Sequence, residues 1–324
     1  MGKSDHGSAL WRIGAHRGNE FISYDIFHIG MDLDLRRLRF FTEVVKQGGF
    51  SQAAKALFAT QPTVSKAVQQ LESELGVKLF ERAGRGSRLT AEGRLVYSRA
   101  VGLLAQAADF MTELDDVRGL QRGTLRLGFP RLGSSALFAP SYAKFRRAFP
   151  RVEVHLGVHS RSQLDDELRA GRLDLAVLTH PISDAFEHEE IRSDPLVVLL
   201  PRTDPLAGRR AVTLKGLRDH PIVLPEEGSG VDELVLDAYR ANGISPTIAA
   251  RSSQVDFIFE LVAAGAGAAF LPQVIAEQRR HRLVHGLRLS ESRCRWRIAY
   301  AWRQGAHLSA AGRAWLSLSK STLA

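Results

Sequence analysis

The sequence predicts a multidomain fold: a small helical domain with a β-hairpin, one long helix, and a larger α/β domain. Three observations predict this division. Apolar residues recur at helical spacing in the first third, a four-three apolar repeat covers residues 90–119, and strand and helix patterns alternate after residue 120. The 324 residues also exceed what one compact core requires. We therefore expect domains at 31–89 and 120–324, joined by a helix at 90–119.

Residues 1–30 show no apolar periodicity, and we expect a poorly ordered extension there. They lack the apolar core of a secretory signal or anchor. No stretch of the chain approaches the roughly 18 apolar residues of a membrane span. The single cysteine, Cys294, excludes an intrachain disulfide and a multi-cysteine metal cluster. These features predict a cytoplasmic protein with no membrane partner and no metal site.

The chain is basic, with 44 Lys and Arg against 35 Asp and Glu and a formal net charge of +9. Residues 31–94 contain 11 Lys and Arg against 7 Asp and Glu, so the excess per residue is greatest there. Positive charge favours a polyanionic partner such as nucleic acid, but it does not identify that partner by itself.

Three short helices are expected before residue 76. The apolar face of the first helix is formed by Leu35, Leu38, Phe41 and Val45. This pattern stops at Gly48 and Gly49. Ser51 is expected to cap a second helix over residues 52–58. Pro62 fits the first turn of a third helix, where its missing N–H costs little, and Gly76 ends that helix.

The third helix should present a polar face. Opposite its apolar stripe lie Pro62, Lys66, Gln69 and Ser73, flanked by Thr63, Ser65 and Gln70. Hydroxyls, amides and a cation are the groups that pair with base edges and phosphates in a major groove. A solvated polar face is also the default for any small helical domain, so the helix alone leaves both interpretations open.

A basic turn follows this helix at a short distance. Two glycines allow residues 81–88 to form a hairpin, in which Arg82, Arg85 or Arg88 could contact phosphates or a narrow minor groove. Two short helices followed by a basic hairpin predict a winged helix-turn-helix.

The same residues carry a family resemblance. The runs Gly49–Ala54, Gln61–Ser65, Glu74–Arg82 and Arg88–Gly93 resemble the DNA-binding domain of LysR-type regulators, almost continuously over residues 33–94. The resemblance implies DNA contacts by the recognition helix at Gln61, Pro62, Thr63, Ser65 and Lys66, and by the wing at Arg82 and Arg85. Ser51, Gln69 and Arg88 are added as candidate DNA contacts.

The long helix is expected to begin after Thr90 as N-cap and to run to about residue 118. Its apolar residues are spaced alternately by four and three, at Val96, Ala100, Leu103, Ala107, Phe110, Leu114 and Val117. Such a seam needs a partner, and a partner within the chain is one alternative. The LysR resemblance favours pairing with the same helix of a second copy, in a homodimer or tetramer that places two recognition helices on two half-sites.

Beyond residue 123 the order strand–helix–strand–helix–strand predicts a mostly parallel sheet. The return of an apolar strand at 296–302 indicates two subdomains, at 123–192 plus 294–324 and at 193–293. This part resembles the LysR effector domain, whose fold is similar to periplasmic binding proteins. The resembling runs are Leu125–Phe129, Gly171–Val177 and Gly265–Pro272.

Ligands of such sheets bind where strands end and helices begin, which favours anions. The candidate effector-binding residues are the polar residues of these loops, Ser134, Ser135, Ser160, Ser162, Thr179, Ser229, Ser252 and Gln254. Most of them could equally be helix caps. We expect no cofactor, only a small organic anion as effector.

Three other functions are alternatives to a DNA-binding regulator. An enzyme is disfavoured because no zinc-protease, nucleophile-elbow or P-loop lysine motif occurs. A solute-binding protein would use the C-terminal fold but not the N-terminal domain. A redox sensor would need a reactive Cys294, whose neighbours Arg293 and Arg295 could lower its pKa. The sequence therefore predicts a transcription regulator that binds promoter DNA sequence-specifically and responds to a small-molecule effector.

Overall fold

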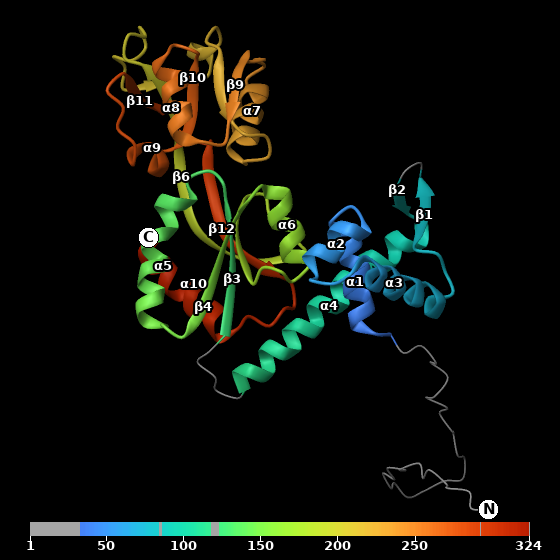
Figure 1. Ribbon diagram of the computed structural model, residues 1–324. Helices are drawn as coiled ribbons and strands as arrows, with labels where there is room; N and C mark the ends of the chain where they lie inside the picture. Colours follow the sequence, from blue (N-terminus) through green and yellow to red (C-terminus); the bar gives the residue numbers. More distant parts are fainter. Residues whose placement is uncertain (1–32, 84–85, 118–122, 292, 324) are drawn as a thin grey trace, which may run out of the picture.

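The structure is a computed structural model and describes residues 33–83, 86–117, 123–291 and 293–323 (Figure 1). The extension expected at 1–30 lies outside the described residues. No helix of the described part is long and apolar enough to cross a membrane.

The N-terminal domain is a winged helix-turn-helix, as predicted. It contains α1 (Leu35–Lys46), α2 (Phe50–Ala56), α3 (Gln61–Leu75) and the antiparallel hairpin of β1 (Phe80–Ala83) and β2 (Gly86–Leu89). The apolar stripes of the helices meet in one core around Leu38, Phe41, Val64 and Leu71, which are almost fully buried. This core fixes α3 with its polar face outward.

The caps of these helices differ from the prediction at one place. The N-cap of α2 is Gly49, so Ser51 lies inside the first turn of α2 and does not cap it. The chain leaves α1 through Gly48 at a positive φ of 71°, which lets the next helix start before Ser51. The N-cap of α3 is Thr60, and Gly76 ends α3 in the left-handed conformation as predicted.

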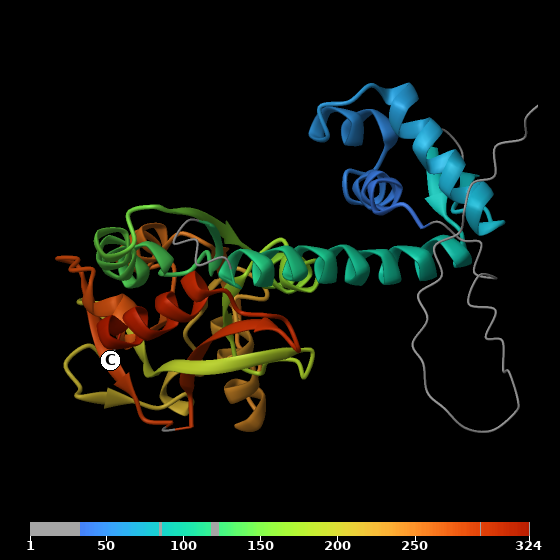
Figure 2. The same ribbon diagram turned by 90° about the horizontal axis from the view of Figure 1, so that it is seen from below.

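Helix α4 (Ala91–Val117) joins the two parts of the chain (Figure 2). Thr90 Oγ1 accepts a hydrogen bond of 2.8 Å from the Gly93 N–H, so the predicted N-cap is confirmed. The first half of α4 packs on the N-terminal core, and its later part contacts the α/β domain.

Each α/β subdomain contains the same order of elements. Subdomain one has β3 (Gly123–Pro130), α5 (Ser134–Ala148), β4 (Val152–His159), α6 (Arg161–Arg169) and β5 (Leu175–Thr179). Subdomain two has β8 (Ile222–Pro225), α7 (Val231–Ala241), β9 (Ile248–Ser252), α8 (Val255–Ala263) and β10 (Ala268–Pro272). In each, the first strand pairs in parallel with the other two.

Two long strands cross between the subdomains. They are β6 (Phe186–Pro201) and β12 (Arg295–Arg303), and β12 pairs antiparallel with residues 186–195 of β6. The main strand order is β4-β3-β5-β12-β6-β10-β8-β9, and β11 pairs with β6 and β7 beside it. The remaining elements are β7 (Ala211–Val212), a 3₁₀ turn (Lys215–Leu217), α9 (Gln273–Glu277), β11 (Val284–Leu289) and α10 (Ala310–Leu323).

The sheet is mixed where the sequence predicted it to be mostly parallel. β12 pairs antiparallel with β5 and β6, and β10 and β11 pair antiparallel with β6. The first half of β6 was missed because it is charged and largely exposed, for example at Glu187 and Glu190. Only its second half, at 196–200, has the buried apolar run from which a strand can be predicted.

Candidate functional site

The N-terminal half of α3 forms an exposed polar surface. Gln61, Pro62, Thr63, Lys66 and Gln69 are exposed, and Ser65 is half-buried. The structure therefore brings the predicted recognition residues onto one face of one helix, beside the end of α2. Such a face can present amides, hydroxyls and a cation to a nucleic-acid groove.

Ser51 acts on this surface through α3. Its hydroxyl donates a hydrogen bond of 2.9 Å to Gln61 Oε1, which links the first turn of α2 to the first residue of α3. The hydroxyls of Thr60 and Thr63 lie 2.8 Å apart and order the same turn. Ser51 is thus placed to orient Gln61.

The wing is present, with Glu81 directly opposite Arg88 in the hairpin. Arg88 donates to Glu81 at 2.9 Å, so its charge is already balanced inside the wing. Arg85 and the side chain of Arg82 lie outside the described residues, so their predicted DNA contacts stay predictions.

Glu72 joins the recognition helix to the wing, and the sequence analysis missed it. Its carboxylate accepts hydrogen bonds from Lys78 Nζ at 2.8 Å and from the N–H groups of Leu79 at 2.8 Å and Phe80 at 3.3 Å. Burial by itself raises the pKa of Glu72, but these hydrogen bonds, that from Lys78 first, outweigh burial and lower it. The sequence indicates such a role only by an acidic residue placed directly beside the buried apolar stripe of α3.

Only part of the predicted helix seam is free for a partner. Ala100 is 1% exposed and belongs to the N-terminal core, on which Val96 also packs. Leu103 and Phe110, further along the same seam, remain 40% and 62% exposed. Ala107 and Leu114 are half-buried, and the side chain of Val117 lies outside the described residues.

Three of the predicted effector residues meet in a cleft between the subdomains. Ser160, Thr179 and Ser229 line it together with Arg131, His159, Arg161 and Glu226. Arg131 Nη1 of subdomain one lies 3.0 Å from Glu226 Oε2 of subdomain two. The remaining cavity is only about 20 Å³, which is space for one water-sized molecule.

The serine hydroxyls of the cleft already have partners. Ser160 and Gln163 form a capping box at the start of α6. Ser229 Oγ donates to Asp232 Oδ1 at 3.0 Å, and the buried Asp232 carboxylate also accepts the N–H groups of Gly228 and Ser229. The helix-cap interpretation therefore describes Ser160. The N-cap of α7 is Gly230, and Ser229, one residue before it, is bonded to Asp232.

The other predicted effector residues that are described, Ser162, Ser252 and Gln254, do not line this cavity. Ser162 is exposed, with its hydroxyl 3.3 Å from that of Ser160. Gln254 lines a neighbouring hollow of about 310 Å³, and its N–H donates to Ser252 Oγ at 3.1 Å. The side chains of Ser134 and Ser135 lie outside the described residues.

Charged side chains of the cleft were not predicted. Arg161 donates through Nη1 to Thr179 O and through Nη2, at 2.6 Å, to Pro181 O, so it ties α6 to the end of β5. Arg131 follows the end of β3, His159 is the last residue of β4, and Arg161 begins α6, which follows β4. A position at the end of a strand was the reason for predicting the serines, and the same reason applies to these basic residues.

Cys294 is unsuited to redox sensing. It is 6% exposed, and burial together with the nearby Glu291 raises the pKa of its thiol. The adjacent arginines do not lower it.

The comparisons with known proteins identify the family of this chain. Residues 35–94 match the family described as bacterial regulatory helix-turn-helix protein, lysR family, and residues 118–324 match the LysR substrate binding domain. The chain therefore belongs to the LysR family. It is a LysR-type transcription regulator and not an enzyme.

Two relatives cover nearly the whole chain. The uncharacterized HTH-type transcriptional regulator YwbI of Bacillus subtilis is 31% identical over 292 residues, covering 90% of this chain and 97% of its own. The RuBisCO operon transcriptional regulator of Allochromatium vinosum is 33% identical over 292 residues, covering 88% and 94%.

Solved structures show the same fold. A full-length OxyR variant from Pseudomonas aeruginosa superposes with a TM-score of 0.69 at 24% identity, covering 90% of this chain and 94% of its own. HinK, a LysR family transcriptional regulator from the same organism, gives a TM-score of 0.57 at 27% identity, covering 90% and 98%.

Proposed function

We propose that the protein binds promoter DNA sequence-specifically as a homodimer, and that a small organic anion held between its subdomains modulates this binding. The observation that carries the proposal is the exposed polar face of α3, fixed to the wing through Glu72. Base edges are read by such groups, whereas phosphates are held by cations such as Lys66.

The charges of the cleft support an anionic effector. Arg131 and Arg161 line it, and Glu226 is the one acidic residue among its described lining residues. Asp165 on α6 already pairs with Arg161 at 3.2 Å, so Arg131 is the cation that an effector would engage. The Arg131–Glu226 ion pair connects the subdomains, and the cavity beside it is too small for an organic ligand. An entering carboxylate or phosphate would take the place of Glu226 as the partner of Arg131 and release this connection.

The DNA-binding part is tested with the purified protein on the DNA upstream of its own gene, in competition with random DNA. Preferential binding that weakens steeply with salt is expected. Equal affinity for several upstream fragments and for random DNA would contradict sequence-specific regulation.

The effector part is tested by calorimetry of the full-length protein with acetate, malonate and inorganic phosphate. Arg131→Ala should weaken the binding of the preferred anion, and Glu226→Gln should strengthen it by removing the competing carboxylate. Glu227→Gln, an exposed neighbour, is the matched control. Unchanged affinity in both cleft variants would refute this assignment while leaving the DNA-binding proposal standing.

A further inference from the structure

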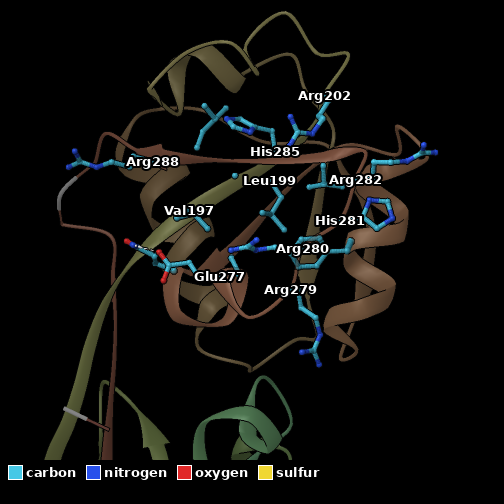
Figure 3. Close-up of a pocket in the computed structure, with 16 residues that line it drawn as sticks. Val197, Leu199, Arg202, Glu277, Arg279, Arg280, His281, Arg282, His285 and Arg288 are labelled. Atoms are coloured by element: carbon cyan, nitrogen blue, oxygen red, sulfur yellow. Dashed lines mark hydrogen bonds between the residues drawn. The ribbon is translucent and has the colours of Figure 1, made fainter.

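Subdomain two contains a groove of about 820 Å³ that the proposed function does not use (Figure 3). It lies between α8, α9, the segment 279–282 and β11, with β6 below it. Within the described residues it shares no lining residue with the cleft at Ser160, Thr179 and Ser229. Its volume is in the range of sites for small organic molecules.

The floor of the groove is apolar. Val197 and Leu199 of β6 and Leu287 of β11 lie below it, and Phe259 of α8 closes one side. These side chains are 9% exposed or less, so they form a fixed, packed base. A ligand with an apolar body would cover this base and exclude water from it.

The rim of the groove is strongly basic. Glu277 is the one acidic residue among its described lining residues. Five arginines line it as well: Arg202, Arg279, Arg280, Arg282 and Arg288. In Figure 3, Arg280 lies in the middle of the group, with Arg202 and His285 together at one edge.

Most of this charge is not balanced by the protein. Arg279 Nε pairs with Asp256 Oδ1 at 2.6 Å, and Glu277 accepts a hydrogen bond from Gln273. In the described part of the chain, Arg202, Arg280, Arg282 and Arg288 form no ion pair with an acidic side chain. Like charges gathered over an apolar floor repel one another and are stabilised by an anionic ligand.

We propose that this groove is a second small-molecule site, which binds an organic anion carrying two negative charges, as a phosphate ester or dicarboxylate, on an apolar body. The guanidinium groups bind the anionic oxygens, and Arg280 can do so in the bidentate geometry that arginine favours. The apolar body lies on Val197, Leu199 and Leu287.

The groove is placed to influence the contact between the subdomains. Helix α9 lines the groove with Gln273, Ala276 and Glu277, and its other side lines the hollow near Gln254 with Ile275 and Gln278. A Cβ on Gly133 would come within 2.4 Å of Ile275 Cδ1, so α9 touches subdomain one closely. A ligand that shifts α9 would therefore be felt across this contact.

The test is calorimetry of the full-length protein with phenyl phosphate, phthalate and inorganic phosphate. Saturable binding of one ligand per chain is expected for phenyl phosphate or phthalate, at least tenfold tighter than for inorganic phosphate. Arg280→Ala should weaken this binding at least tenfold. Arg210→Ala, an exposed arginine of the same subdomain outside the groove, should leave it unchanged.

A second variant blocks the groove without straining the fold. Gly286 lines it with an exposed position, and an added Cβ would meet only Leu199 Cδ2, at 3.7 Å. Gly286→Glu would place a competing carboxylate beside the arginines and should also weaken binding at least tenfold.

Three results would overturn the proposal. One is the absence of saturable binding of all three probes at millimolar concentration. Another is binding that is lost in Arg131→Ala but retained in Arg280→Ala and Gly286→Glu, which would place the anion in the cleft. The third is groove variants that weaken DNA binding alone, which would make the groove a nucleic-acid surface.

Discussion

The carboxylate of Glu72 connects the recognition helix α3 to the wing. Its charge is held by Lys78, and its oxygens accept the N–H groups that begin the hairpin. A buried acceptor of this kind stabilises the fold mainly because its removal leaves the buried N–H groups without a partner. Glu72 therefore adds a polar connection between α3 and the wing to the apolar packing of Phe80 on Phe41 and Phe50.

Glu72→Ala, which removes both acceptor oxygens and leaves the N–H groups of Leu79 and Phe80 without a partner, should destabilise the N-terminal domain by about 1–3 kcal/mol at neutral pH. The pKa of Glu72 is lowered in the folded state, so its stabilisation is present above the ordinary value of 4.5 and is lost as the pH falls through the lowered pKa. The difference between variant and parent should shrink in that acid range.

Hydrogen exchange of the amides of Leu79 and Phe80 in the full-length protein measures this effect locally. Glu92→Ala, at an exposed acidic residue in the first turn of α4, is the matched control. Equal protection in the Glu72 variant and its parent at pH 7 would contradict the role of Glu72.

At the scale of the element, α4 shows what apolar periodicity predicts and what it leaves open. The spacing from Val96 to Leu114 predicted a long helix with a buried seam, and the helix and its Thr90 cap are confirmed. Periodicity indicates that a face is covered but not by what. Ala100 is covered by the chain's own N-terminal core, whereas Phe110 is exposed.

In the α/β domain, too, local sequence patterns predict some elements and not others. The apolar strands β5, β8 and β10 could be predicted because all their residues are buried. The charged half of β6 could not, since its pairing with β12 is a long-range contact that leaves no local pattern. In the site, the serines at strand ends were predicted, but the charged partners Arg131 and Glu226 come from segments far apart in the chain and meet only in the fold.

The exposed residues of α4 predict a dimer contact. Replacing both Leu103 and Phe110 by serine should weaken dimerisation at least roughly tenfold, because each large apolar side chain contributes about 1.5–3 kcal/mol when buried. Sedimentation at decreasing protein concentration measures the change. Ala108→Ser, at an exposed position off the seam, is the control for loss of helix propensity. An unchanged dimer would exclude this face of α4 as the interface.

At the scale of the whole molecule, α4 is held to the α/β domain of its own chain by two acidic residues. Arg303 Nη2 donates to both oxygens of Asp109 at 2.7 Å, and His307 Nε2 lies 2.9 Å from Asp116 Oδ2. The buried Ala105 of α4 also packs against Gly171 of the α/β domain. A change in the α/β domain can therefore reach α4 through these contacts.

Asp109→Asn together with Asp116→Asn should loosen this attachment while leaving both domains folded. The second half of α4 should then exchange its amide hydrogens faster, because the charged hydrogen bonds contribute roughly 1.5–3 kcal/mol each. Hydrogen exchange by mass spectrometry measures the effect, with Glu113→Gln as the exposed control on the same helix. Unchanged protection would show that the ion pairs do not couple α4 to the domain.

The most direct test of the account is the affinity of the full-length protein for its upstream DNA and for random DNA over a range of salt. Gln61→Ala should cost about 1–3 kcal/mol on the upstream DNA and little on random DNA, whereas Lys66→Ala should weaken both and reduce the salt slope by about 1. Gln106→Ala on α4 should change neither. If Gln61→Ala behaved like Gln106→Ala, or if upstream and random DNA bound alike, the exposed face of α3 would not be what reads the DNA.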